Sequence, residues 1–498
     1  MATPIRIHPD NPKCFEFRGK PLVLLTATEH YGAVMNRPFR FERYLADAAE
    51  KHITLTRLFV LFRELQSAVN PYSTCKPESP DYIAPFARTG PGAALDGEPK
   101  FDLDRPNLEF FDRLHRFLGL ASDYGIIVEV TLLSNTYWSM IWSLNPLNDQ
   151  NNVNGLEKIE WAEYMTRRHP KVFERQLAHV RKIVEETNRY DNIFYEICNE
   201  PGGNASGVAN APTLDEVNQW QTVIADCIRD TERALPNQHL IAGQEAFDYQ
   251  PFAQGATRSF SDFCVDIVNV HPLPSTTYRE ASYDMGKFMS KQLKLQAVRE
   301  FCLATRSERK PLNLDEDNVA SQYKDFDGWT IHRKRAWTTL FCGAHYDYID
   351  FSIINYCEAG TAESQRCIRT WMKHLAEFIR TVDIVRARPL PDWLQSHPPH
   401  TLCSVYAVDG EDYCVYLADG RELGEGAGGP IHGAVTFGLP AGSYSAACFS
   451  PVTGLYSPTM PLQGSQKSLI VLPEFRHDLV LRIRKREQPG KPATGVTR

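Results

Sequence analysis

Hydrophobic residues along the first three quarters of the chain alternate between short apolar runs and longer segments with helical spacing. Turn residues bound eight apolar runs, and such runs are typical of parallel strands that are buried on both faces. The predicted strands cover residues 21–26, 53–62, 125–133, 192–198, 239–243, 266–270, 311–315 and 347–354. The predicted helices cover residues 39–51, 107–124, 170–187, 213–234, about 285–304, 330–344 and 362–382. This alternation predicts an α/β fold, a (β/α)8 (TIM) barrel with enlarged loops.

Local signals support this pattern. The segment 107–124 places its aromatic and leucine side chains on one stripe at spacings of three to four residues, and Thr213 with Glu216 forms a capping box at a helix start. An open doubly wound sheet would give the same alternation. Neither GxGxxG nor GxxxxGK[ST], the phosphate-binding motifs of such sheets, follows the first strand, so the closed barrel is favoured.

The pattern changes near Arg386, where four prolines fall within residues 389–399. Beyond this stretch, short alternating runs separated by glycine-containing turns predict an antiparallel β-sandwich. The predicted division is a barrel over 1–385, a linker over 386–400, a smaller sandwich domain over 401–486 and a flexible tail over 487–498.

Composition narrows the class of protein. The 498 residues are 43% hydrophobic, which is enough for a packed core, and the net charge of −7 disfavours nucleic acid as a partner. No run approaches the ~18 apolar residues of a membrane span, and no signal peptide is evident, so we expect a cytoplasmic protein without membrane contact. Twelve cysteines are scattered singly, which predicts free thiols and no metal site. The oligomeric state is left open.

The predicted strand ends bring several polar residues to one end of the barrel, because the C-terminal ends of all its strands open on the same face. Asn199 and Glu200 follow the fourth strand, and Glu316 follows the seventh. The other candidates for the site are Arg57 in the second strand, His30 after the first, Trp138 after the third, His271 after the sixth and Tyr356 after the eighth.

Two carboxyl groups across a barrel mouth suit hydrolysis of a glycosidic bond. One protonates the leaving oxygen while the other attacks the anomeric carbon, at a separation of about 5 to 5.5 Å when configuration is retained. Glu200 is the predicted acid/base, because burial beside the negative Glu316 would favour its protonated form. Glu316 is the predicted nucleophile, kept ionised by Arg57, and Asn199 is predicted to bind the sugar 2-hydroxyl. No cofactor is expected, since the carboxyl groups supply the chemistry.

This set of residues resembles the retaining glycoside hydrolases of clan A, the cellulase-like barrels similar to glycoside hydrolase family 5. The resemblance rests on Ile-Cys-Asn-Glu-Pro ending at Pro201, on Glu316, on Arg57 and on His271, and it covers roughly the first 385 residues. It implies the same roles for the two glutamates. Many members carry a tryptophan after strand eight, where this chain has Asn355 and Tyr356, and a tyrosine two residues after the strand-six histidine, where this chain has Leu273. Tyr278 and Tyr356 are candidates for the missing hydroxyl.

Alternatives stay open at this point. A shift of one residue in the seventh strand would select Asp315 or Asp317 in place of Glu316. A catalytically silent barrel that binds carbohydrate, an inverting hydrolase, or a transglycosylase with the same carboxylate pair would fit similar residues. The stretch 63–105 shows no helix or strand signal and is interpreted as a wall of the cleft, and Trp138 is either a sugar platform or a core residue.

Overall fold

The structure is a computed structural model. It describes residues 3–28, 33–37, 39–61, 81–202, 207–249, 252–253, 258–270, 277–278, 281–282, 295–317, 326–349, 362–422 and 424–486.

Eight parallel strands form the central sheet, in the order β4-β17-β16-β13-β10-β9-β8-β5. They are β4 (Leu25–Thr28), β5 (Leu55–Phe59), β8 (Ile127–Ser134), β9 (Ile193–Asn199), β10 (Ile241–Gly243), β13 (Ile267–Asn269), β16 (Leu312–Asp317) and β17 (His345–Ile349). The two end strands meet, because the amide of Thr54, next to β5, donates to the carbonyl of Leu25 in β4 at 3.0 Å. The sheet therefore closes, and the predicted (β/α)8 barrel is confirmed.

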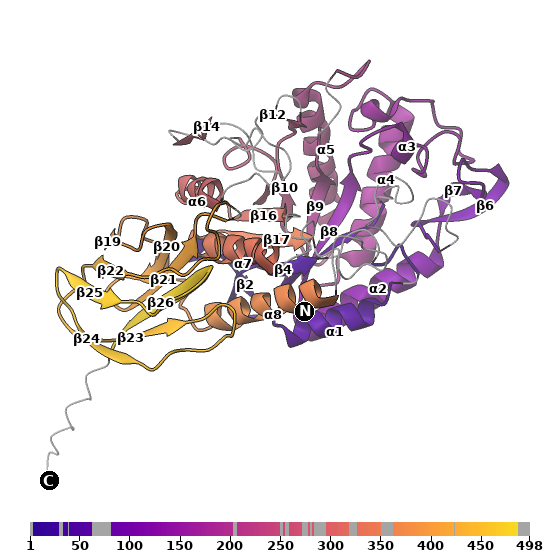
Figure 1. The fold of residues 1–498 in the computed structure, drawn as a ribbon. Helices are drawn as coiled ribbons and strands as arrows, with labels where there is room; N and C mark the ends of the chain where they lie inside the picture. The colour runs from indigo at the N-terminus through magenta and orange to yellow at the C-terminus, as the bar shows by residue number, and fades with distance from the viewer. Residues whose placement is uncertain are drawn as a thin grey trace, which may run out of the picture.

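Helices cover the outside of the barrel (Figure 1). They are α1 (Phe41–Glu50), α2 (Leu108–Tyr124), α4 (Pro170–Thr187), α5 (Leu214–Glu232), α6 (Leu295–Ala304), α7 (Phe326–Phe341) and α8 (Ala362–Ile379), with a short α3 (Ser139–Trp142) and a 3-10 turn, η1 (Trp161–Glu163). The stripe predicted on α2 is buried, and its helix begins at the N-cap Asn107, whose side chain accepts from the amide of Glu109. Among described residues, no helix has the length and apolarity needed to cross a bilayer.

A small antiparallel sheet closes the N-terminal end of the barrel. It consists of β1 (Arg6–His8), β2 (Asn11–Phe17) and β3 (Lys20–Leu22), and its Phe15 and Phe17 pack against the first residues of several barrel strands. The prediction of one continuous strand over residues 21–26 was wrong, because this run is divided between two sheets. Its beginning pairs with β2, its end pairs with β17, and the chain passes from one sheet to the other at residues 23–24.

A hairpin occupies part of the stretch that was expected to lack strands. β6 (Phe86–Ala93) pairs with β7 (Pro99–Pro106), so the expectation was wrong for these residues, and residues 62–80 lie outside the described part. The hairpin was missed because it is largely exposed and contains Gly90-Pro91-Gly92, a composition that is unfavourable in buried strands. Two further short pairs are β11 (Asp248–Tyr249) with β12 (Phe252–Ala253) and β14 (Thr277–Tyr278) with β15 (Ala281–Ser282).

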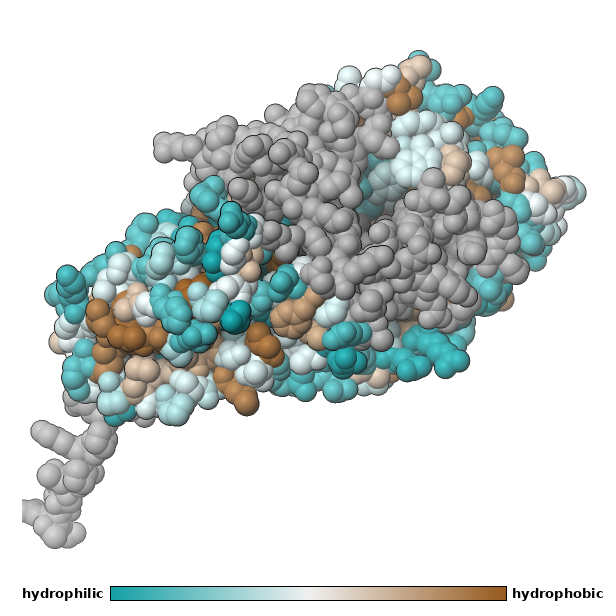
Figure 2. Space-filling model, in the orientation of Figure 1, coloured by the Kyte–Doolittle hydropathy of each residue, from teal (hydrophilic) through white to brown (hydrophobic). Residues whose placement is uncertain are grey.

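The C-terminal region forms two antiparallel sheets with a shared apolar core, which confirms the sandwich. One contains β18 (Arg388–Pro389), β20 (Thr401–Val408), β21 (Asp412–Asp419), β26 (Asp478–Lys485), β23 (Ser443–Phe449) and β24 (Met460–Gln463); the other contains β19 (Leu394–Ser396), β22 (Ala434–Phe437) and β25 (Ser468–Val471). In Figure 2, apolar residues gather over the sandwich, where Leu469 and Val471 of β25 are exposed.

Helix α7 lies between the barrel and the sandwich (Figure 1). Residues 328–341 of this helix are all buried, including the charged Arg333, Lys334 and Arg335. Arg333 donates two hydrogen bonds to the carboxylate of Asp478 in β26, at 2.7 and 2.8 Å, and Trp337 stacks on Tyr416 with ring centroids 5.6 Å apart. The sandwich therefore covers one wall of the barrel.

Candidate active site

The described structure brings three of the predicted site residues to the middle of β5 and to the C-terminal end of β9. Arg57 and Asn199 are buried, and Glu200 follows Asn199 directly. Trp138 lies in the loop after β8 and is 37% exposed. The backbone of Glu316 belongs to β16, but its side chain lies outside the described part, as do His30, His271 and Tyr356.

Arg57 joins two opposite strands of the barrel. Its Nη2 lies 2.7 Å from each carboxylate oxygen of Glu196 in β9, and 3.3 Å from Oδ2 of Asp315 in β16. The same nitrogen donates to Oδ1 of Asn199 at 2.9 Å. Because a guanidinium is planar and carries several donors in fixed directions, these contacts fix the positions of the three partners relative to one another.

The amide of Asn199 is held on all sides. Its oxygen accepts from Arg57, and its Nδ2 donates to Oγ of Ser134 at 3.2 Å and to Oη of Tyr137 at 2.7 Å. Tyr137 itself has a positive φ of 57°, a conformation that non-glycine residues adopt rarely. The side chain predicted to bind the sugar 2-hydroxyl is therefore preorganised. Its partner Tyr137 directly precedes Trp138 after the third predicted strand, but it was not among the predicted site residues.

The backbone around Glu200 is also constrained. Glu200 has a φ of 49° and Gly202 a φ of 89°, and a Cβ on Gly202 would lie 2.6 Å from the carbonyl oxygen of Phe247. The amide of Phe247 donates to the carbonyl of Pro201 at 3.1 Å. Left-handed conformations at non-glycine residues cost free energy and recur at functional sites, where the surroundings maintain them. This turn aims the residue after β9 in a direction that a continued strand would not give.

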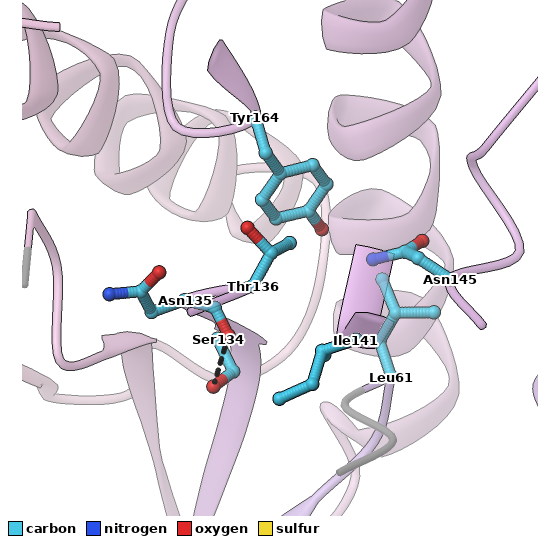
Figure 3. Close-up of a pocket in the computed structure, with 7 residues that line it drawn as sticks. All are labelled: Leu61, Ser134, Asn135, Thr136, Ile141, Asn145 and Tyr164. Carbon is cyan, nitrogen blue, oxygen red and sulfur yellow. Dashed lines mark hydrogen bonds between the residues drawn. The ribbon is translucent and has the colours of Figure 1, made fainter. Parts of the chain in front are cut away.

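The loop after β8 is tied to this turn and to a small pocket beside it. Asn135 donates from Nδ2 to the carbonyl of Glu200 at 3.1 Å, and its Oδ1 accepts from the amide of Tyr137 at 2.9 Å. Figure 3 shows the pocket, where Tyr164 and Thr136 lie opposite Ile141 and Leu61. Oγ1 of Thr136 donates to the carbonyl of Trp161 at 2.9 Å. The loop that carries Tyr137 and Trp138 is therefore anchored from both sides.

Four acidic side chains lie inside the barrel beneath this site, and we call them the carboxyl cluster: Glu129, Glu196, Asp315 and Asp347. Oxygens of Glu129, Glu196 and Asp315 lie within 4.8 Å of one another, a spacing that could also hold a metal ion. Glu196 further accepts from Oγ1 of Thr131 at 2.6 Å. The cluster was not predicted, although single acids within apolar runs such as Gly125–Leu133 are an available signal, because isolated charges are rarely buried.

Burial controls the titration of this cluster. Desolvation raises the pKa of Glu129 well above its usual range, and the negative charges of Asp315 and Glu196 raise it further. Desolvation likewise raises the pKa of Asp347, with Asp315 as the next cause.

The pairing of β16 with β17 shifts by one residue at the predicted nucleophile. Leu314 is paired with Tyr346 and Asp317 with Tyr348, so Asp315 and Glu316 together stand opposite Asp347. In a regular strand, neighbouring residues face opposite sides of the sheet, so a buried Asp315 would place residue 316 outside the barrel. A bulge removes this restriction.

Comparison with known proteins agrees with the barrel fold and finds one family model that matches. Residues 88–298 match the family model described as Cellulase (glycosyl hydrolase family 5); this range includes Asn199 and Glu200 but neither Arg57 nor Glu316. A solved structure named glycoside hydrolase aligns over 97% of both chains, with a TM-score of 0.58 and 11% identity. A glycoside hydrolase family 5 structure from Bacteroides vulgatus aligns over 97% of this chain and 94% of its own, with a TM-score of 0.59 and 12% identity. A search of curated proteins gives no match.

The match over residues 88–298 confirms the predicted resemblance to the cellulase-like glycoside hydrolases of clan A. The chain is a glycoside hydrolase whose substrate is a carbohydrate.

Proposed function

We propose that the chain hydrolyses O-glycosidic bonds of an oligosaccharide or glycoconjugate by double displacement, with Glu200 as acid/base and Glu316 as nucleophile. One observation supports this most: Arg57 contacts β9 through Glu196 and Asn199 and contacts β16 through Asp315. Glu200 directly follows the first of these strands, and Glu316 belongs to the second. A single buried cation therefore ties together the two halves of the proposed carboxyl pair.

The proposed reaction has two steps. In the first, the carboxylic acid of Glu200 donates its proton to the glycosidic oxygen while the carboxylate of Glu316 attacks the anomeric carbon, so the leaving sugar departs as an alcohol and a glycosyl ester forms. In the second, the Glu200 carboxylate takes a proton from water, whose oxygen attacks the anomeric carbon and releases Glu316. Asn199 binds the sugar 2-hydroxyl. The positive charge of Arg57 stabilises the ionised carboxylate of Glu316 on β16. His30, His271, Trp138 and Tyr356 remain proposed substrate contacts.

Substitution of each glutamate tests the assignment. Glu316→Gln removes the nucleophile and Glu200→Gln removes the acid/base, so each should lower kcat on natural substrates by about 10²–10⁴-fold or more, because such groups contribute on that scale. Glu200→Gln should lose less on aryl glycosides with activated leaving groups, which need no proton. Labelling with a 2-fluoro glycoside followed by peptide mapping should mark Glu316.

Glu245 offers a matched control. It follows β10 near the same end of the barrel, but its Oε2 accepts from the amides of Arg258 and Ser259 at 2.7 and 3.0 Å and so supports a loop. Glu245→Gln should keep near-native turnover. Near-native rates in Glu200→Gln or Glu316→Gln would refute the assignment, and an inverted anomeric configuration in the first product would replace it with single displacement.

A further inference from the structure

The carboxyl cluster holds more acid than nearby positive charge. Its four side chains are at most 2% exposed, and they point into the barrel from β8, β9, β16 and β17. Arg57 on β5 is the cation that acts on both Glu129 and Asp347 within the described barrel, and it already pairs with Glu196 and Asp315. β13 adds the neutral Asn269, while β4 and β10 contain no ionisable residue.

Asp347 shows how the excess charge is removed. As a carboxylate it can only accept, and both of its oxygens are then buried without a hydrogen-bond partner among the described residues. Its carboxyl group lies within hydrogen-bonding reach of Asp315, so a single proton on Asp347 converts a repulsion into an O–H···O⁻ bond. An ionised Asp347 would instead be a buried, unpaired charge, which is far more costly.

Glu129, like Asp347, has a buried carboxyl oxygen without a hydrogen-bond partner among the described residues. One of its oxygens accepts from Nδ2 of Asn269, whose other contact is Oδ2 of Asp315 at 3.4 Å. The second oxygen, Oε2, is buried and has no partner in the described part of the chain. A proton on this oxygen leaves Glu129 neutral beside two other acids.

We propose that Glu129 and Asp347 are protonated in the folded enzyme at neutral pH and act as neutral positioning residues for Arg57 and β16. Because both groups are neutral, the positive charge of Arg57 interacts with the carboxylates of Glu196 and Asp315 and with groups at the mouth of the barrel. The Asp347–Asp315 hydrogen bond lies where the register of β16 and β17 shifts, so it also fixes the backbone at residue 316. The link to residue 316 rests on the proposed function; the protonation does not.

The pH dependence of folding measures these protons directly. A group whose pKa is raised by folding contributes stability below its unfolded pKa, and this contribution is lost as pH rises toward the folded pKa. In Asp347→Asn and Glu129→Gln, the amide mimics the neutral acid at every pH. In wild type each of these groups loses its proton on unfolding, and in the variant it has none to lose. Between about pH 5 and 8, the unfolding constant of wild type should therefore rise with pH by about tenfold per pH unit relative to that of each variant. Asp112→Asn, at a 72% exposed side chain, is the control and should run parallel to wild type.

Activity and cation binding complete the test. Asp347→Asn should retain more activity than Asp347→Ala, and its kcat should stay high to a more alkaline pH than that of wild type. A loss of activity that is confined to Glu200→Gln or Glu316→Gln tests only the catalytic assignment. Slopes of Asp347→Asn and Glu129→Gln that run parallel to wild type would overturn the proposal. So would a rise in Tm with Ca²⁺, Mg²⁺ or Mn²⁺ that is abolished by EDTA and absent in Glu129→Gln, since the cluster would then hold a metal ion.

Discussion

At the scale of single residues, Asn199 is the side chain whose environment says most about substrate binding. Both hydrogens of its amide are engaged, one by Ser134 and one by Tyr137, so a sugar hydroxyl must replace or share one of these partners. The Tyr137 hydroxyl lies 2.7 Å from Nδ2, and the Tyr137 ring lies next to that of the exposed Trp138. We expect this hydroxyl to orient the Asn199 amide for the sugar.

Tyr137→Phe should lower kcat/KM by roughly fivefold, because one hydrogen bond of about 1 kcal/mol is removed from Asn199, the group proposed to bind the 2-hydroxyl. The measurement is kcat/KM on an aryl glycoside beside its 2-deoxy analogue, for which the variant and the wild type should differ less. Tyr190→Phe is the control, since its hydroxyl donates to the carbonyl of His115 at the other end of the barrel. An equal loss on both substrates would contradict the role given to Tyr137.

At the scale of elements, the start of α5 links two parts of the barrel wall. Thr213 and Glu216 form the predicted capping box, and Glu216 also accepts from Arg168 at 2.9 and 2.7 Å. The hydrogen bond from Arg168 is the main cause that lowers the pKa of Glu216 to about 2. A lowered folded pKa contributes stability above the unfolded value of 4.5, and this contribution is lost as pH falls toward 2.

Glu216→Gln should therefore lower the free energy of unfolding at pH 7 by about 1 kcal/mol, a figure kept small because the side chain is 36% exposed. The difference from wild type should shrink as pH falls from 4.5 to 2, as measured by urea unfolding at several pH values. Asp215→Asn, an exposed acid in the same first turn, controls for the loss of a charge. A difference that stays constant with pH would show that the ionised carboxylate is not the stabilising group.

Helices and strands whose apolar residues recur at regular spacing could be predicted from the sequence. The segments that connect them were harder to predict. Pro170–Thr187 begins and ends where its apolar spacing indicated, because packing of that stripe dominates its stability. The run 21–26 was divided between two sheets, since apolar character alone does not distinguish a barrel strand from the strand that closes its end. Asn199 and Glu200 were found as the residues that follow a predicted strand, and Arg57 as a charged residue within one. The carboxyl cluster could not be assembled from the sequence, because Glu129 and Asp347 stand in different runs and meet only when the barrel closes.

At the scale of the whole molecule, the contact between barrel and sandwich depends on a buried ion pair. Arg333 of α7 and Asp478 of β26 are fully buried, Tyr416 donates to the same carboxylate at 2.9 Å, and the guanidinium lies 4.2 Å from the ring of Trp371. Removing one member of such a pair leaves the other charge buried and unpaired.

Arg333→Met should lower the free energy of unfolding by about 3–5 kcal/mol and separate the unfolding of the sandwich from that of the barrel. Chemical unfolding followed by tryptophan fluorescence and by far-UV circular dichroism measures this, because Trp337 stacks at the interface. Arg386→Met is the control: its pair with Glu411 has side chains 54% and 51% exposed and should contribute less than about 1 kcal/mol. Similar losses in both variants would contradict a special role for the buried pair.

The burial of residues 328–341 of α7 also limits how this enzyme can be rearranged. An appended β-sandwich is often treated as an independent domain that can be removed or exchanged without loss of the catalytic domain's stability. Here a fragment ending at residue 385 would expose a helix whose residues 328–341 have no solvent face, among them the stretch His-Arg-Lys-Arg-Ala-Trp. The sandwich serves this barrel as its outer wall, and recombination of the catalytic part with a foreign module would have to rebuild that wall, including a carboxylate for Arg333.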